Sequence, residues 1–157
     1  MKFFLENIED IVAAIFITIT TILVIVNIIM RYVLNSGLVW SEEVATGCFV
    51  WAVFIGAVGA FKRRGHEGVD IVVKMLPAGP RKVLTTLMDI VLVALNGFMA
   101  YLSVLYIMTS YTKMTPVLGI SSAYISSSVL IAFVLMTFYS IKFVYEDFTG
   151  KGKEGEK

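Results

Sequence analysis

The sequence has few of the residues from which catalytic and metal sites are built. It contains one cysteine, Cys48, and one histidine, His66. A single cysteine excludes an internal disulfide and a CxxC redox or zinc site, and a single histidine excludes bis-histidine haem ligation within the chain. The sequence also has no catalytic constellation, nucleotide-binding loop or cofactor motif. We therefore predict that the chain is not an enzyme and has no catalytic, cofactor or metal site.

Charged residues are scarce as well. They make up 16% of the 157 residues, against about 25% in a typical soluble domain, while 58% of the residues are hydrophobic. The mean hydropathy is +0.85. The formal net charge is only +1, so the composition gives no reason to expect a nucleic-acid partner. The composition predicts an integral membrane protein that is surrounded by the lipid bilayer.

The apolar residues form four long runs, which we expect to be transmembrane helices at about 11–30, 44–61, 90–111 and 121–141. The first run has no charge, and at about 1.5 Å per residue it spans roughly 30 Å of hydrocarbon. In lipid a single spanning segment must satisfy its own backbone, so a helix is expected despite the many β-branched residues. The start of the chain lacks the pattern of a cleaved signal peptide, and we expect the first helix to be retained.

Two polar segments complete the expected architecture. Between the second and third runs, apolar and charged side chains alternate with helical spacing over residues 67–76, which predicts a short amphipathic helix at the membrane interface. Residues 142–157 are rich in charge and glycine and are expected to form a cytoplasmic tail. The predicted fold is thus all-α, with four transmembrane helices and one interfacial helix.

The basic residues predict the orientation. Of the 13 Lys and Arg residues, all but Arg31 and Lys113 lie near the termini or between the second and third runs. By the positive-inside rule, both termini are expected in the cytoplasm. Lys62, Arg63 and Arg64 are expected to be interfacial anchors, which hold the end of the second helix at the cytoplasmic surface of the membrane.

Polar residues gather at the first outer turn. We expect Ser41 to cap the second helix, with Glu42 and Glu43 in its first turn, where the helix dipole favours carboxylates. Trp40 lies at the depth of an aromatic belt and is expected to be an interfacial anchor. Arg31 has two interpretations: its side chain reaches lipid headgroups, or it faces a partner and bonds another helix, Glu42 or Glu43.

Small residues recur in the second run. Ala52, Gly56 and Ala60 follow one another at every fourth position, a spacing that lets another helix approach closely in lipid.

In the third helix, Asp89 precedes the uncharged run and is expected at the inner border of the membrane. A proton-relay role for Asp89 is the alternative interpretation.

Several short motifs resemble those of the small membrane subunit of tripartite ATP-independent periplasmic (TRAP) transporters, the DctQ-like family. In chain order the motifs are Arg31-Tyr32-Val33, Trp40-Ser41-Glu42-Glu43, Phe49-Val50-Trp51, Gly56-Ala57, Ala60-Phe61, Arg63, His66, Val69-Asp70 and the segment 115–120. Together they cover about a third of the chain. The shared four-helix plan extends the resemblance to the remainder.

The resemblance implies a supporting role in sodium-coupled uptake of an organic acid, in the inner membrane of a bacterial or archaeal cell. In such systems a periplasmic substrate-binding protein delivers the substrate to a large membrane subunit, which carries the substrate and sodium sites, while the small subunit braces it. The charged residues of the two outer turns would face the binding protein, and the row of small residues in the second helix would face the large subunit. These partner-facing residues are Arg31, Glu42, Glu43 and Lys113, and then Ala52, Gly56 and Ala60.

Two other functions compete with this interpretation. One is a self-sufficient, proton-coupled multidrug-type transporter that acts as a homo-oligomer and uses Asp89 or Glu43. The other is the membrane anchor of a redox enzyme, against which the single histidine argues.

Overall fold

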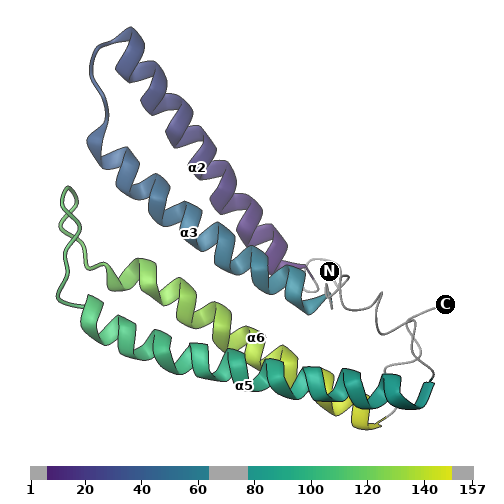
Figure 1. Cartoon of the computed structure of the whole chain (residues 1–157). Helices are drawn as coiled ribbons and strands as arrows, with labels where there is room; N and C mark the ends of the chain where they lie inside the picture. Colours follow the sequence, from purple (N-terminus) through teal and green to yellow (C-terminus); the bar gives the residue numbers. More distant parts are fainter. Residues whose placement is uncertain (1–6, 64–77, 150–157) are drawn as a thin grey trace.

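The protein is all-helical over the residues that the structure describes, 7–63 and 78–149. In the computed structural model four helices follow one another: α2 (Ile8–Val33), α3 (Val39–Lys62), α5 (Ala78–Ser110) and α6 (Ala123–Thr149) (Figure 1). All four are long and apolar enough to cross a membrane. The chain is therefore an all-α membrane protein with four spans, as its four apolar runs predict.

The helices extend beyond the uncharged runs. α5 begins at Ala78, ahead of the apolar run that starts near residue 90, and α6 continues to Thr149 instead of ending near residue 141. Helix therefore replaces the first part of the expected tail. The interfacial helix expected at 67–76 lies outside the described residues, as does Arg64.

The start of α3 differs from the prediction. The helix begins at Val39, with Leu38 as its N-cap residue, and the hydroxyl of Ser41 donates a hydrogen bond to the Leu38 carbonyl at 2.7 Å. The prediction that Ser41 caps this helix is therefore wrong. The reason lies in α2, because the Asn27 side-chain oxygen accepts the Leu38 N–H at 2.8 Å and holds the chain just before the helix.

The four helices form an open row in the order α2, α3, α6, α5. Each helix packs on its neighbours in this row, and α2 and α6 meet in addition through the side chains of Glu9 and Tyr139. The connections 34–38 and 111–122 lie at one end of the row, which we call the loop end (Figure 1). The start of α2 and the end of α6 lie at the opposite end, which we call the terminal end.

Small residues allow α3 to approach α2 closely. A Cβ atom on Gly56 would lie 3.5 Å from the Ala13 Cβ, and one on Gly59 would collide with the Asp10 carboxylate. Within α2, by contrast, Glu9 is the only described residue that is buried. A side chain at position 59 would therefore have to displace the Asp10 carboxylate of α2.

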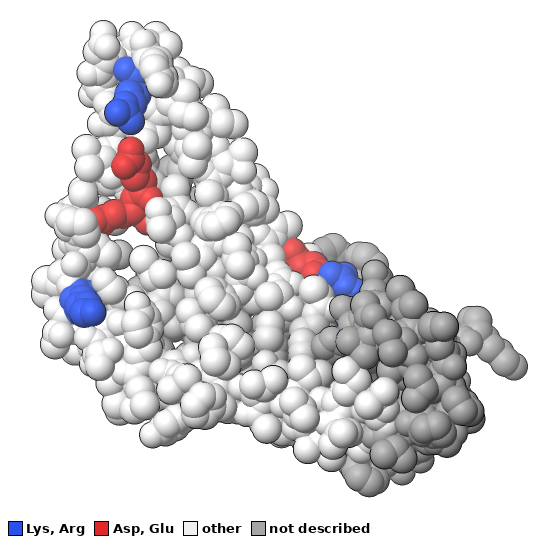
Figure 2. Space-filling view, viewed as in Figure 1, with Lys and Arg blue, Asp and Glu red and all other residues white. Residues whose placement is uncertain are grey.

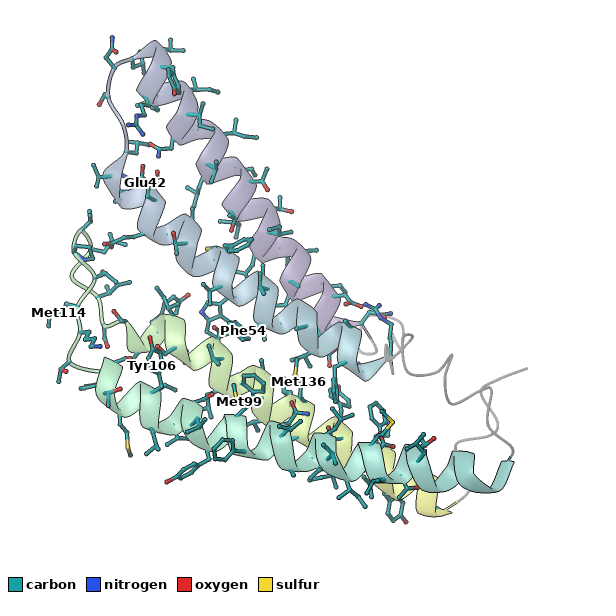
Figure 3. The ribbon with its side chains drawn as sticks, viewed as in Figure 1. Glu42, Phe54, Met99, Tyr106, Met114 and Met136 are labelled. Carbon is teal, nitrogen blue, oxygen red and sulfur yellow. The ribbon has the colours of Figure 1, made fainter. Side chains whose placement is uncertain are left out.

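Aromatic rings connect α3 with both of its neighbours. Trp51 of α3 stacks on Phe16 of α2, with 5.8 Å between the ring centroids. The ring centroid of Tyr124 in α6 lies 5.9 Å from that of Trp51. Phe54, which points from α3 toward α6 in Figure 3, meets Phe133 edge-on at 6.4 Å. α3 therefore lies at the centre of the packing.

The outer faces of α2 and α5 remain apolar and exposed. Ile22 is 55% exposed and Phe98 is 59% exposed, and many neighbouring apolar side chains are exposed to a similar extent. In water such faces would be unfavourable, but lipid tails are as apolar as these side chains. The membrane therefore explains why this row of helices has a small core.

Candidate docking surface

The loop end brings together all four charged residues expected to face a partner. Figure 2 shows two basic side chains on either side of an acidic pair at this end. The four charged residues are Arg31 in the last turn of α2, Glu42 and Glu43 near the start of α3, and Lys113 in the α5–α6 loop. Arg31, Glu42 and Lys113 are exposed and Glu43 is half-buried. The surface is therefore polar, mixed in charge and open to a partner.

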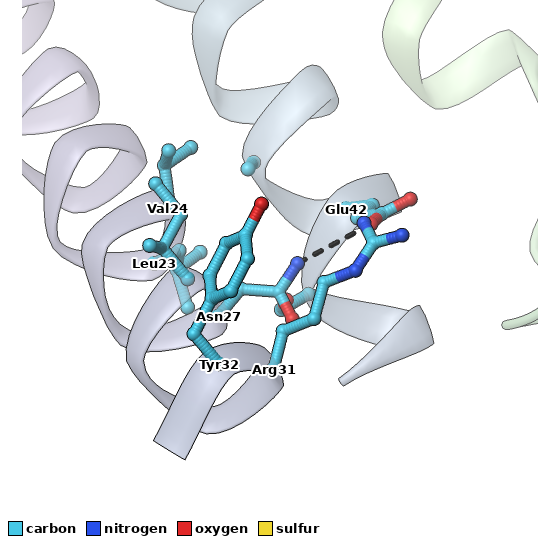
Figure 4. A pocket seen from close by; sticks show the side chains of 9 residues that line it. Leu23, Val24, Asn27, Arg31, Tyr32 and Glu42 are labelled. Carbon is cyan, nitrogen blue, oxygen red and sulfur yellow. Dashed lines mark hydrogen bonds between the residues drawn. The ribbon is translucent and has the colours of Figure 1, made fainter. Parts of the chain in front are cut away.

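A groove between α2 and α3 forms the first part of this surface (Figure 4). It has a volume of about 280 Å³, with apolar walls that include Leu23 and Ile28 and a polar rim that includes Arg31 and Glu42. Asn27 spans the groove, because its amide nitrogen donates to Glu42 Oε1 at 3.3 Å. Among the described residues Arg31 has no ion-pair partner, so Asn27 rather than Arg31 bonds Glu42.

Glu43 connects α3 to the α5–α6 loop. Its two carboxylate oxygens accept the backbone N–H groups of Val117 and Leu118, at 2.8 and 2.9 Å. A hollow of about 230 Å³ lies next to this contact, with Thr115 and Pro116 of the loop on its wall. The sequence does not predict this contact, although the Pro116 and Gly119 pattern in the loop is a signal for a tight turn.

The α5–α6 loop is itself well ordered by hydrogen bonds. Met114 pairs with Ser121 in an isolated antiparallel bridge, and the Ser122 N–H donates to the Lys113 carbonyl at 2.8 Å. Thr115 N–H donates to the Ile120 carbonyl, also at 2.8 Å. The loop therefore presents Lys113 and Met114 on a defined hairpin, and Met114 is 74% exposed.

The terminal end contains a different cluster, made of side chains alone. Lys62 of α3 forms an ion pair with Glu9 of α2 at 3.0 Å, and the Tyr139 hydroxyl of α6 donates to the same carboxylate at 2.6 Å. Beside them, Arg63 forms two hydrogen bonds with Asp10, at 2.7 and 3.0 Å. Lys62 and Arg63, the expected interfacial anchors, thus bind acidic residues of α2.

The remaining predicted residues are placed as follows. Ala52 is 7% exposed, and Gly56 faces Ala13, so these two small residues serve packing within the chain, while Ala60 is exposed. Trp40 is 45% exposed at the loop end.

Asp89 is buried and shares a face of α5 with a row of buried polar residues at seven-residue spacing, Asn96, Ser103 and Ser110. This row lies toward α6, where the Asn96 amide donates to the Ser140 hydroxyl at 3.3 Å.

The described residues do not bring three His, Cys, Asp or Glu side chains together in a way that could hold a metal ion. What they form is a four-span membrane protein with a polar surface at the loop end. This architecture defines the class of small multi-span membrane proteins.

Comparison with known proteins identifies the family. The family model for the DctQ component of tripartite ATP-independent periplasmic transporters matches residues 20–150. A Haemophilus influenzae protein named "Putative TRAP transporter small permease protein" is 32% identical over 124 residues, which cover 76% of this chain and 75% of that protein. The chain therefore belongs to the DctQ family, the small permease components of TRAP transporters.

Two further relatives show how the family varies. The C4-dicarboxylate TRAP transporter small permease protein DctQ of Vibrio cholerae is 38% identical over 80 residues, which cover 51% of this chain and 34% of that protein. The sialic acid TRAP transporter permease protein SiaT of Haemophilus influenzae is 27% identical over 142 residues. That match covers 90% of this chain but 23% of SiaT, so SiaT contains a segment like this chain within a much longer polypeptide.

Proposed function

We propose that this chain is the scaffold of a TRAP transporter: it braces a large membrane subunit and helps to dock a substrate-binding protein during sodium-coupled uptake of an organic acid. The substrate and sodium sites lie in the large subunit. The chain lies in the inner membrane. Its loop end faces the periplasm, and both of its termini lie on the cytoplasmic side. The distribution of basic residues supports this orientation.

The open row of helices is the observation that carries the proposal. A substrate pathway through one chain needs helices that surround it, whereas α2 and α5, at the two ends of the row, do not pack on each other in the described part of the chain. The grooves at Asn27 and at Pro116 both lie at the loop end. A chain of this form is suited to contact another membrane protein along its length.

The match to SiaT supports a large membrane partner. A segment related to nearly the whole of this chain occurs within a longer permease. Such a segment is covalently held next to the other parts of that permease. We propose that this chain occupies the corresponding position as a separate subunit, beside a large permease subunit.

The class of substrate follows from the relatives alone. Their names specify C4-dicarboxylates in one case and sialic acid in another, and both are organic acids. We propose an organic acid for the transporter to which this chain contributes. The residues described here do not select among organic acids, because in this proposal they do not line the pathway.

Reconstitution tests the proposal. The chain, the large subunit and both together are placed in liposomes, each with the binding protein and with an inward sodium gradient. We expect organic-acid uptake only when both membrane subunits are present. Uptake by this chain alone would overturn the scaffold role and support a self-sufficient transporter.

Charge reversal at the loop end tests docking. Arg31→Glu, Glu42→Lys and Lys113→Glu are compared in the assembled complex, with Arg63→Glu at the terminal end as the matched control. We expect weaker binding of the substrate-binding protein for the loop-end variants and unchanged binding for the control. If none of the three variants changes binding or uptake, these residues do not take part in docking.

Site-directed labelling tests the orientation. In a Cys48→Ser background, Lys113→Cys is treated with an impermeant thiol reagent on right-side-out vesicles. We expect Lys113→Cys to react from outside and Arg63→Cys to react only after the vesicles are opened. The opposite pattern would overturn the proposed topology.

A further inference from the structure

The contact between Glu43 and the α5–α6 loop uses both oxygens of the carboxylate. Glu43 Oε1 accepts the Val117 N–H and Oε2 accepts the Leu118 N–H. Hydrogen bonds to an ionised acceptor are about twice as strong as neutral ones. Glu43 therefore directs its acceptor atoms to the chain's own backbone, although its position at the loop end suggested contact with a partner.

The loop needs such an acceptor because of its local sequence. Residues 115–119 form a single turn that is closed by the Gly119 N–H and the Thr115 carbonyl, at 3.1 Å. Pro116 has no N–H, and the next two N–H groups have no carbonyl partner within the turn, as at the start of a helix. Gly119 then leaves the turn with φ of +64°, a conformation that glycine adopts readily. The carboxylate of Glu43 satisfies the two N–H groups that this geometry exposes.

Bound in this way, the loop presents a compact set of side chains at the surface. Lys113 and Met114 lie on one strand of the small hairpin, and Met114 lies at the loop end in Figure 3. Val117 and Leu118, whose N–H groups Glu43 holds, have side chains that are 46% and 40% exposed. The loop therefore combines a cation with exposed apolar groups, the kind of surface that protein interfaces use.

We infer that Glu43 is a positioning residue for docking: its carboxylate holds the 111–122 loop in the shape that contacts the substrate-binding protein, and Glu43 itself makes no contact with that protein. The inference rests on the docking role proposed above and names the part of the surface that carries it. Glu42 is the natural contrast, since it is exposed and bonds the Asn27 amide instead of the loop.

Glu43→Gln is the sharpest test because it keeps the size of the side chain. A glutamine has one acceptor oxygen, and its NH₂ group would face one of the two backbone N–H groups. The variant is prepared in the assembled complex of this chain with the large subunit in lipid nanodiscs. Amide hydrogen exchange is measured at Val117 and Leu118, and Glu42→Gln is the matched control. We expect about tenfold faster exchange for Glu43→Gln and no change for Glu42→Gln.

Binding of the substrate-binding protein separates positioning from direct contact. A loop that is no longer held must be ordered on binding, so we expect the Kd of Glu43→Gln to rise about fivefold. Because screening in about 1 M salt removes exposed charge contacts, a positioning role predicts that the ratio of Kd values between variant and wild type persists there. A ratio that falls to one in high salt would mean that Glu43 contacts the partner directly, which would overturn the inference.

The remaining outcomes are also decisive. Unchanged amide exchange in Glu43→Gln would overturn the role of Glu43 in holding the loop. Faster exchange with unchanged affinity and uptake would overturn the role of the loop in docking, while uptake by the wild-type complex would leave the proposed function standing. If the wild-type complex does not bind the substrate-binding protein, the proposed docking function fails, and the exchange experiment still decides whether Glu43 shapes the loop.

Discussion

The two ends of this helix row are held by different kinds of interaction. At the terminal end, side chains bind side chains. The Glu9 carboxylate accepts hydrogen bonds from Lys62 and Tyr139, and the Asp10 carboxylate accepts them from Arg63. At the loop end, a side chain binds backbone, as Glu43 does with two N–H groups of the α5–α6 loop. The terminal cluster thus joins three helices, whereas the loop-end contact joins a helix to a loop.

The difference has a physical cause. Helices satisfy their own backbone, so two helices can be joined only through side chains that their register brings together. A tight turn leaves N–H groups without partners, and these groups need an acceptor from elsewhere in the chain. Changes at the terminal end should therefore alter the stability of the whole row, and changes at the loop end should alter one loop.

The largest effect is expected where α2 and α3 are closest at the terminal end. Gly59→Leu would drive its side chain into Asp10 and against the Glu9 Cβ, which lies 3.7 Å from a Cβ at this position. Overpacking of this kind costs about 1–3 kcal/mol. A titration with denaturing detergent should show this decrease in the free energy of unfolding, together with separation of the α2–α3 pair.

Gly97→Leu in α5 is the matched control, since a Cβ at Gly97 has no neighbour within 4 Å. We expect little change there, or a small gain from the better helix propensity of leucine. Equal destabilisation by the two substitutions would contradict the close approach of α3 to α2.

A smaller effect is expected from Tyr139→Phe. The substitution removes the 2.6 Å hydrogen bond to Glu9 and keeps the ring. A hydrogen bond to a charged group is worth about 1.5–3 kcal/mol in a protein, and partial access to solvent places this one near the lower value. Thermal unfolding in detergent measures the loss, with the exposed Tyr145→Phe as a control that should behave like the wild type.

The loop end should respond locally. Gly119→Ala places a side chain at φ of +64°, which costs about 1 kcal/mol for an ordinary residue. We expect faster amide exchange within 115–120 and an unchanged unfolding transition for the helices. Gly119→Asn should have less effect, because asparagine tolerates this conformation. A loss of global stability in Gly119→Ala would contradict the contrast between the two ends.

The smallest effect is expected at the outer ion pair of the terminal cluster. The side chain of Arg63 is 61% exposed and that of Asp10 is 32% exposed, and exposed pairs contribute about 0–1 kcal/mol. Arg63→Gln should therefore lower stability slightly in dilute buffer and not at all in about 1 M salt. An effect as large as that of Tyr139→Phe would show that this pair is more important than its exposure suggests.

The number and type of helices were predictable because lipid restricts what a spanning chain can do. Long uncharged runs must be helical there, and the four runs correspond to α2, α3, α5 and α6. The ends of the helices were less predictable. α2 takes in Glu9 and Asp10 and α3 extends to Lys62, because these charges neutralise one another across the helix pair.

The candidate docking surface was predictable in its residues but not in its contacts. The outer turns supplied Arg31, Glu42, Glu43 and Lys113, and the structure places them at one end. Local rules placed a helix cap at Ser41, whereas α3 starts just after Leu38, whose N–H donates to the Asn27 side-chain oxygen. Nothing near Glu43 in the sequence shows that its partners are N–H groups beyond Pro116.

The sequence by itself determined that this protein crosses a membrane four times as helices, since no other spanning structure satisfies the backbone of a long apolar segment in lipid. Only the tertiary structure decided the order of the row, the pairing of Glu9 with Lys62 and Tyr139, and the attachment of Glu43 to the α5–α6 loop. These contacts join residues far apart in the chain. Their formation depends on how the helices pack, which periodicity and composition do not encode.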